Sequence, residues 1–343
     1  MPDLPRLSTV RWQLRPAAFD DPAAAYGAGF IGAWHDPEGR EQLRDEVEKA
    51  GGLWEAASVA GEYGFMEQGA GKLCLISHEI FKAFGPTALP GAAQLCGDCV
   101  SHSTKNAILG TLSTAINHGL SGKPITVPAG IAQGVLAPEA IYSMRGYSGD
   151  GWSCEEALQV AIRSIGAVSR RPHPDADWDL TTYSLANAHK YGARKPPEKV
   201  IEALGAHKVT TVTRCRSYEE IRDMIASGFA ITSCGGEGFS NHRNEDGVSA
   251  RSGHWSHALA YLGVDDRQDT KSKYGCGLVL VQNSWGKAWI SGPRKVRGTD
   301  YEIPEGSFWA KWNDISARFA SAVNTVAKWE PRKLPDLGLL DLI

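Results

Sequence analysis

The sequence predicts an α+β protein in which a helical half precedes a sheet-rich half. Residues 89–195 carry helical signals, with apolar residues recurring on one helix face and capping motifs at helix starts. From Gly228 onward, short apolar runs bounded by Gly, Asn and Asp are typical of β-strands. Helices followed by strands, without βαβ alternation, favour two segregated lobes. The 343 residues are enough for two lobes at roughly 150 residues per domain.

The helices are predicted from their periodicity and their ends. Charged or amphipathic stretches indicate helices over 37–50 and 78–84. Ile108 and the apolar residues four, seven and eight positions later predict a helix that begins at Cys99 and stops at Gly119. Capping boxes, in which Glu follows Ser three residues later, predict helices over 153–165 and 217–227. Residues 180–191 are also predicted to be helical.

Three apolar runs predict strands in the second half, over 229–232, 258–262 and 278–281. Pro and Gly residues between 85 and 92 break the preceding pattern and indicate a boundary there. The predicted division is an N-terminal extension at 1–88, a helical lobe at 89–195, a β-rich lobe at 196–325 and a C-terminal tail at 326–343. The extension is expected to cover the site, to bind a protein partner or to extend the sheet.

Charge and hydropathy exclude some classes of function. The net charge is 36 − 39 = −3 and the pI is near 6.4, so no basic surface for a nucleic acid backbone is expected. The longest uncharged stretch, between Lys105 and Lys123, is too polar and too short to span a membrane. The N-terminus lacks the basic and apolar segments of a secretory signal. Seven scattered cysteines do not form a disulfide scaffold, and together these features predict a reducing, cytoplasmic location.

Cys99 is the first candidate for chemistry, because it stands at the predicted start of a helix. Unsatisfied backbone N–H groups and the helix dipole stabilise a thiolate there, although a buried inert cysteine would fit the position alone. The Cys96-x-x-Cys99 spacing also suggests zinc or redox chemistry. No second close cysteine pair completes a structural zinc site, and no strand precedes the motif as in a thioredoxin-like pair. No metal or organic cofactor is therefore expected.

His257 and Asn283 are the other candidates. His257 directly precedes a predicted strand, where an imidazole can act as a general base. Asn283 follows another predicted strand, and its side-chain oxygen can orient one imidazole nitrogen while the other faces a thiol. Taken singly, a structural histidine and a strand-end turn would explain these residues as well.

Together these motifs, in this order, make the chain resemble the papain-like cysteine peptidases. The matching segments are Cys96-Gly-Asp-Cys99, His257-Ala-Leu-Ala-Tyr-Leu-Gly263, Asn283-Ser-Trp-Gly-Lys-Ala-Trp289 and the glycine-rich strip at 146–151. The resemblance covers roughly residues 88–325. It implies a two-lobe papain-like fold and a triad of Cys99 as nucleophile, His257 as base and then acid, and Asn283 as orienting residue.

The resemblance also implies further site residues. Gln94 would supply an oxyanion-hole donor, although it lies one residue closer to the nucleophile than is usual in the family. Gly149 and Asp150 would offer groups to an extended substrate, and Ser256 and Trp285 would line the site. The chain departs from the family at four places: Val100 replaces an aromatic residue, Asp98 adds a carboxylate that opposes the thiolate if it points inward, Tyr147 replaces the cysteine that would bridge to Cys96, and residues 290–305 form an insertion before a strand near 306–312.

The predicted function is therefore a thiol hydrolase that cleaves peptide or isopeptide bonds through a thioester, with a peptide or protein as substrate. A structural or assembly protein with the same fold, such as a component of a virus particle or a secretion machine, is an alternative that would leave the chain associated with a complex. A cell-wall amidase of the NlpC type is a lesser alternative, because its histidine follows the cysteine much sooner than the 257 − 99 = 158 residues found here.

Overall fold

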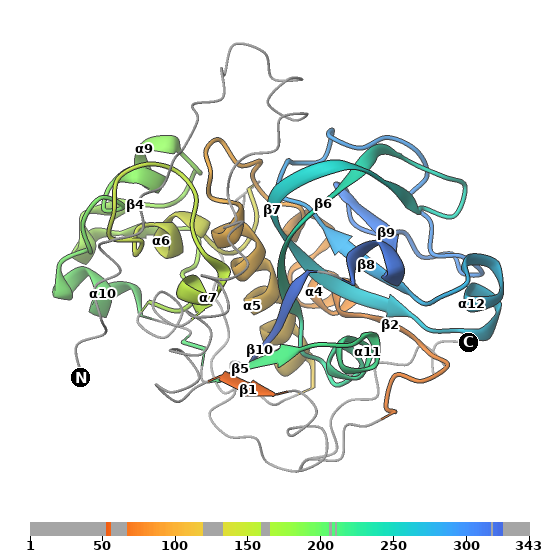
Figure 1. Cartoon of the computed structure of the whole chain (residues 1–343). Helices are drawn as coiled ribbons and strands as arrows, with labels where there is room; N and C mark the ends of the chain where they lie inside the picture. Colours follow the sequence, from red (N-terminus) through yellow and green to blue (C-terminus); the bar gives the residue numbers. More distant parts are fainter. Residues whose placement is uncertain are drawn as a thin grey trace.

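The computed structural model describes residues 53–55, 67–118, 133–158, 165–205, 208–209, 211–316 and 318–324. A helical half and a sheet-rich half lie side by side, and helix α5 (Cys99–Asn117) runs between them (Figure 1). The α+β class and the order of the two halves are thus confirmed. The helix expected over 37–50 and the tail at 326–343 lie outside the described residues. The helical half contains α6 (Pro138–Tyr142), α7 (Cys154–Glu156), α9 (Leu185–His189) and α10 (Glu198–Leu204).

The main sheet of the described residues has the strand order β1-β5-β10-β6-β7-β8-β9, and β2 pairs with β7 away from this path. Its strands are β1 (Leu53–Glu55), β2 (Leu73–Leu75), β5 (Thr211–Cys215), β6 (Ile231–Arg243), β7 (Ser249–Asp265), β8 (Leu278–Gln282), β9 (Ser307–Lys311) and β10 (Phe319–Asn324). β1 and β5 are parallel, whereas the other pairs are antiparallel. Register shifts occur within the β6–β7 and β7–β8 pairs, and such irregularities increase the twist of a sheet. β6 and β7 accordingly curve away from the central helix in Figure 1.

Helix α5 is packed on several sides, which holds its first residue in place. Its residues from Cys99 to Ala115 are all buried. Gly110 lies so close to Ala230 and Ile76 that a Cβ atom would come within 2.7 Å of each. Glycine at this point therefore permits the close approach of α5 to both the sheet and helix α4 (Ile76–Phe84).

Part of the predicted N-terminal extension belongs to this core. β2 pairs with β7 at residues 263–265, and α4 follows it directly with Ile76 and Ile80 buried. The helix expected over 78–84 is thus present and begins two residues earlier. Residues 73–84 extend the sheet-rich half, which is one of the three roles expected for the extension.

Several predicted elements have different bounds in the structure. The helix expected over 180–191 spans only Leu185–His189, because the Ser184 side chain accepts a hydrogen bond from the Asn187 N–H and starts the helix there. A short hairpin precedes it, formed by β3 (Pro172–His173) and β4 (Trp178–Asp179). β7 is much longer than the predicted run at 258–262, because its first half is polar and exposed and so carries no apolar signal.

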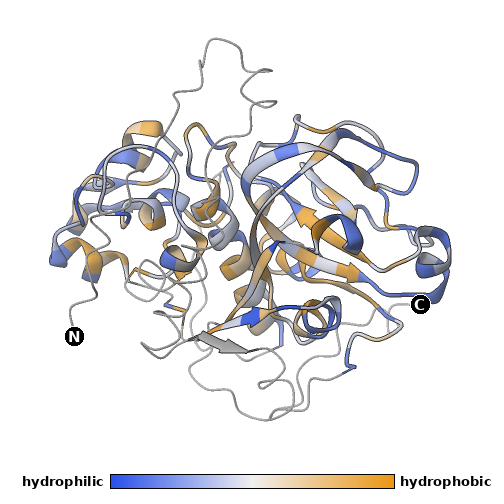
Figure 2. Ribbon diagram, in the orientation of Figure 1, coloured by the Kyte–Doolittle hydropathy of each residue, from blue (hydrophilic) through white to orange (hydrophobic). Residues whose placement is uncertain are grey.

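Strand β8 and helix α12 differ in how deeply their residues are buried. Figure 2 shows hydrophobic residues on β8, whose five residues are all buried, and hydrophilic residues on helix α12 (Gln268–Tyr274). No helix among the described residues is long and apolar enough to cross a membrane.

A disulfide bond joins Cys154 of α7 to Cys234 of β6, 80 residues apart in the sequence. It connects the helical half to the sheet. The sequence shows no disulfide scaffold because the two cysteines are far apart along the chain, and only the packing of α7 on β6 brings them together. This single bond was not predicted from the sequence. Such bonds persist chiefly in oxidising compartments.

Candidate active site

Cys99 lies at the N-terminus of the central helix. It is the first residue of α5, and its side chain is fully buried. The loop before it is held by backbone hydrogen bonds from Gln94 N–H to the Ser284 carbonyl, at 2.8 Å, and from Gly151 N–H to the Gly97 carbonyl, at 3.0 Å. The structure thus ties the start of α5 to both halves.

His257 and Asn283 form a hydrogen-bonded pair on neighbouring strands. Ala260 of β7 is paired with Gln282 of β8, so in the antiparallel register His257 faces the residues that follow β8. His257 Nε2 lies 2.8 Å from Asn283 Oδ1, which also accepts the Ser284 N–H at 2.7 Å. Because an amide oxygen only accepts, Nε2 carries the proton. His257 Nδ1 is then left as the basic nitrogen, and it is buried without a hydrogen-bond partner among the described residues.

Tryptophan rings cover this pair. The Trp285 ring lies 4.8 Å from the His257 ring between centroids, and Trp255 lies 4.6 Å from Trp285. Trp289 contacts both tryptophans edge-on. Trp255 and Trp285 are buried, so they exclude water from the His257–Asn283 hydrogen bond and strengthen it.

Arg318 holds the backbone of His257 in place, a role that was not predicted from the sequence. Its fully buried guanidinium donates to the carbonyl oxygen of His257, to the carbonyl of Glu237 at 3.0 Å and to Ser233 Oγ at 3.2 Å. It thereby joins β6 and β7 at the histidine. Arg318 lies in a stretch without a recognised motif, so only the tertiary contacts reveal it.

Cys99 lies against the same strand as His257. The backbone N–H groups of Ala258, the residue after His257, and of Val100 hydrogen-bond with the Cys99 sulfur and favour its thiolate. No hydrogen bond between Cys99 and His257 themselves is present in the described part of the chain. The structure therefore brings Cys99 to the strand that carries His257, with the Nδ1 of His257 unpaired.

Burial determines the protonation of both groups. Burial, opposed by the backbone hydrogen bonds, raises the pKa of Cys99 to about 12. Burial also lowers the pKa of His257 to about 3, against the effect of the Asn283 hydrogen bond. At neutral pH the thiol and the imidazole are both uncharged in this closed arrangement. An ion pair between them requires a less buried state.

The Asp98 side chain points inward, which is the orientation in which its charge is expected to oppose the Cys99 thiolate. It is fully buried, accepts a hydrogen bond from Tyr183 Oη at 2.9 Å and lies 3.4 Å from His102 Nε2. Its negative charge contributes to the raised pKa of Cys99. His102, on α5, was not recognised from the sequence because an isolated buried histidine carries no motif.

The amide group of Gln94 makes hydrogen bonds within the loop before Cys99 and to Ser284. Its Nε2 donates to the Cys96 carbonyl at 2.8 Å, and its Oε1 accepts from Ser284 Oγ. Gln94 therefore links the loop before Cys99 to the residue after Asn283. An oxyanion role for this side chain stays a prediction.

The predicted substrate-binding residues differ in exposure. Gly149 is exposed, and Asp150 and Ser256 are partly exposed, whereas Trp285 is buried and packs on His257. Gly149 and Asp150 lie next to Gly151, whose backbone bonds to the loop of Cys96 and Cys99. The glycine-rich strip is thus adjacent to the start of α5.

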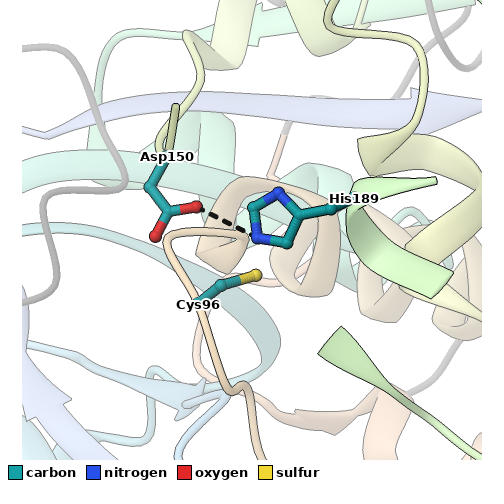
Figure 3. Close-up of side chains that lie close together, drawn as sticks. All are labelled: Cys96, Asp150 and His189. Carbon is teal, nitrogen blue, oxygen red and sulfur yellow. Dashed lines mark ion pairs between the residues drawn. The ribbon is translucent and has the colours of Figure 1, made fainter. Parts of the chain in front are cut away.

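A second group of side chains lies beside this loop. Single ligand atoms of Cys96, Asp150 and His189 are all within 4.8 Å of one another, and Figure 3 shows the three side chains converging. Cys96 forms no disulfide. His189 was not recognised from the sequence, because it is distant from the other two residues along the chain.

Comparisons with known proteins find similarity in structure alone. No protein-family model matches the sequence, and no curated protein matches it. Xylellain, a cysteine protease from Xylella fastidiosa, is similar over 72% of this chain and 88% of its own, with 15% identity and a TM-score of 0.43. Procathepsin L 3 of Tenebrio molitor is similar over 68% of this chain and 67% of its own, with 16% identity and a TM-score of 0.39. Procathepsin B S9 of Trypanosoma congolense is similar over 74% and 77%, with 12% identity and a TM-score of 0.43. These structures are papain-like cysteine proteases, the class that the sequence motifs resemble.

Proposed function

We propose that the protein is a papain-like thiol hydrolase that cleaves peptide or isopeptide bonds with Cys99, His257 and Asn283. The single observation that carries the proposal is the 2.8 Å hydrogen bond between His257 Nε2 and Asn283 Oδ1. It leaves His257 Nδ1 as an unpartnered base on the strand against which the Cys99 sulfur lies. A buried base without a partner is costly for stability, so a chemical role would explain its presence.

In the proposed reaction, the Cys99 proton moves to His257 Nδ1, and the thiolate attacks the carbonyl carbon of the scissile bond. The carbon–nitrogen bond breaks as the imidazolium gives its proton to the leaving amine. Water then hydrolyses the thioester, with His257 as base, and releases a carboxylic acid and the free thiol. Asn283 keeps the imidazole in the required orientation and tautomer.

The catalytic side chains have to become accessible for this reaction. Cys99, His257 and Asn283 have no exposed surface in the structure. We propose that substrate or a partner opens the site locally, a motion that commonly gates enzymes. Opening would hydrate the two groups and reverse the pKa changes that burial causes, so that the thiolate–imidazolium pair can form. Gly149, Asp150, Ser256 and Trp285 are the proposed substrate-binding residues.

The test is covalent labelling with an epoxysuccinyl peptide, which reacts with a thiolate beside a cationic histidine. Intact mass spectrometry of the protein is expected to show a single adduct, and peptide mapping is expected to place it at Cys99. Cys99→Ala should remove the adduct. Cys276→Ala is the matched control, because Cys276 is also a free cysteine but is partly exposed, and this variant should label normally.

The role of the base is tested on the same reaction. His257→Ala should slow labelling by about a hundredfold or more, since a general base typically contributes 10²–10⁴-fold. His254→Ala changes the exposed histidine three residues away on β7 and should leave the rate unchanged. Labelling at another cysteine, or equal rates for both histidine variants, would contradict the proposed triad.

The complete burial of the three side chains also favours a second candidate, an assembly protein that keeps the fold without turnover. Such a protein would copurify in a stable complex, with residues 1–88 as the proposed binding segment, and would cleave no member of a peptide library. Adduct formation together with peptide turnover would exclude it. A cytoplasmic location stays a prediction, and the disulfide between Cys154 and Cys234 favours an oxidising one.

A further inference from the structure

The side chains of Cys96, Asp150 and His189 come from three separate segments. Cys96 lies on the loop before α5, Asp150 on the glycine-rich strip, and His189 is the last residue of α9. Figure 3 shows the carboxylate of Asp150 facing the His189 ring, with the Cys96 sulfur directed toward them. The proposed peptidase reaction uses neither Cys96 nor His189. We propose that these three residues form a binding site for a zinc-type divalent transition-metal ion.

The ligand types suit such an ion. Thiolate, imidazole and carboxylate are the ligands that zinc takes in proteins. One thiolate and one carboxylate together balance the two positive charges of the ion. The carboxylates of Asp98 and Asp150 add negative potential at the Cys96 sulfur, which favours a cation there, and the smaller contribution of Arg145 opposes it.

The spacing suits tetrahedral coordination. His189 Nε2 and Asp150 Oδ1 are 3.4 Å apart, and tetrahedral zinc with bonds of about 2.05 Å separates nitrogen and oxygen ligands by roughly 3.4 Å. The Cys96 sulfur lies within 4.8 Å of the other two ligand atoms. In the same tetrahedral geometry, the Cys96 sulfur would lie roughly 3.6 Å from the His189 and Asp150 ligand atoms. A small adjustment of the Cys96 side chain would achieve this distance.

The surrounding hydrogen bonds hold the ligands in place, as outer-shell contacts do in metal sites. Tyr142 Oη donates to Asp150 Oδ1 at 3.2 Å and accepts the Gly151 N–H at 3.2 Å. The Gly151–Gly97 backbone hydrogen bond of 3.0 Å joins the strip of Asp150 to the loop of Cys96. Arg145, the nearby cation, stacks on the Tyr142 ring at 3.6 Å and donates to the Gly149 carbonyl.

The site is open on one side. The His189 and Asp150 side chains are 40% and 35% exposed, whereas Cys96 is buried. An ion can therefore enter from solvent and keep a fourth position for water. None of its ligands belongs to the proposed triad, and it shares Asp150 with the proposed substrate-binding residues.

The test is titration of the metal-free protein with cobalt(II), a spectroscopic substitute for zinc. One equivalent should bind with a thiolate-to-cobalt charge-transfer band and the visible absorption of tetrahedral cobalt, and zinc should displace it. Cys96→Ser should abolish the charge-transfer band. His189→Asn and Asp150→Asn change partly exposed residues and should weaken binding at least about tenfold, since even outer-shell partners are worth that much.

Two cysteine variants serve as controls. Cys276→Ser and Cys99→Ser should both bind cobalt as the unmodified protein does, which separates this site from adventitious thiols and from the proposed nucleophile. Circular dichroism of each variant verifies that it is folded. Absence of a thiolate band at saturating cobalt, its survival in Cys96→Ser, or its loss in Cys276→Ser would each overturn the proposal.

Discussion

At the scale of single residues, the hydrogen bond between His257 and Asn283 is the feature with the most chemical meaning. It is fully buried and covered by Trp285. Its strength therefore depends on the exclusion of water as much as on the 2.8 Å distance. The same burial keeps Cys99 and His257 uncharged, so the proposed reaction requires a more open state.

Asn283→Ala is expected to slow epoxysuccinyl labelling of Cys99 by about ten- to a hundredfold. Removal of the Asn283 side chain leaves His257 Nε2 without an acceptor, which costs roughly 1–3 kcal/mol. Each 1.4 kcal/mol corresponds to a factor of ten in rate. The measurement is the second-order labelling constant. Asn244→Ala is the control, because Asn244 Oδ1 likewise accepts two hydrogen bonds, here from the backbone N–H groups of Asp246 and Val248 in a turn away from His257. Equal labelling of the two variants would be inconsistent with an orienting role.

His257 is also expected to make stability depend on pH. Its pKa is about 3 in the folded chain and near 6.5 when unfolded, so the unfolded state binds the extra proton between these values. Protonation of His257 therefore leaves the free energy of unfolding unchanged above pH 6.5. Between pH 6.5 and about pH 3 it lowers this free energy by roughly 1.4 kcal/mol for each pH unit. Urea unfolding at several pH values should show this slope, and His257→Gln should reduce it. The exposed His254→Gln should keep the slope, and a slope unchanged in His257→Gln would refute the assignment.

At the scale of elements, serine side chains cap the starts of three helices, and the sequence identifies two of these caps. α11 (Tyr218–Ala226) begins after Ser217, whose side chain accepts the Glu220 N–H. α7 and α9 begin in the same way after Ser153 and Ser184. These caps are local, so a capping motif indicates the start of a helix but not how far it continues.

Ser217→Ala is expected to lower the free energy of unfolding by about 1 kcal/mol, because a backbone N–H of α11 loses its acceptor. Ser217→Asp should retain most of the stability, since aspartate is an equally good cap. Urea denaturation of both variants provides the comparison. Equal stability of Ser217→Ala and the unmodified protein would show that the cap is replaced by water.

At the scale of the whole molecule, the two halves are joined by α5 and by a covalent bond. The central helix contacts α4, α6 and several strands, and the Cys154–Cys234 disulfide ties α7 to β6. Arg318 adds a buried connection between β6 and β7 behind His257. Cys99, the first residue of α5, thus lies where the two halves meet.

Reduction of the disulfide is expected to destabilise the protein by about 4 kcal/mol, because the bond closes a long loop in the unfolded chain. The loop spans 80 residues. Urea unfolding with and without a reductant measures the difference, and Cys154→Ser should reproduce it without any reductant. Cys276→Ser should have no such effect. A reduced protein as stable as the oxidised one would show that the bond contributes nothing to the native state.

Features that depend on neighbouring residues could be predicted from the sequence alone. The helix from Cys99, the caps at Ser153 and Ser217 and the buried run in β8 were predicted, because periodicity and capping are local. The order Cys99, His257, Asn283 could be noticed for a similar reason, since each residue adjoins a helix or strand that the sequence predicts.

Features that join distant segments become visible only in the folded chain. The pairing of β2 with β7, the Cys154–Cys234 disulfide, the support of His257 by Arg318 and the group of Cys96, Asp150 and His189 have no local signal. The complete burial of Cys99, His257 and Asn283 likewise has no local signal. Burial results from what packs around a side chain, and the packing partners come from everywhere along the chain, so burial and the pKa changes it causes appear only when the chain is folded.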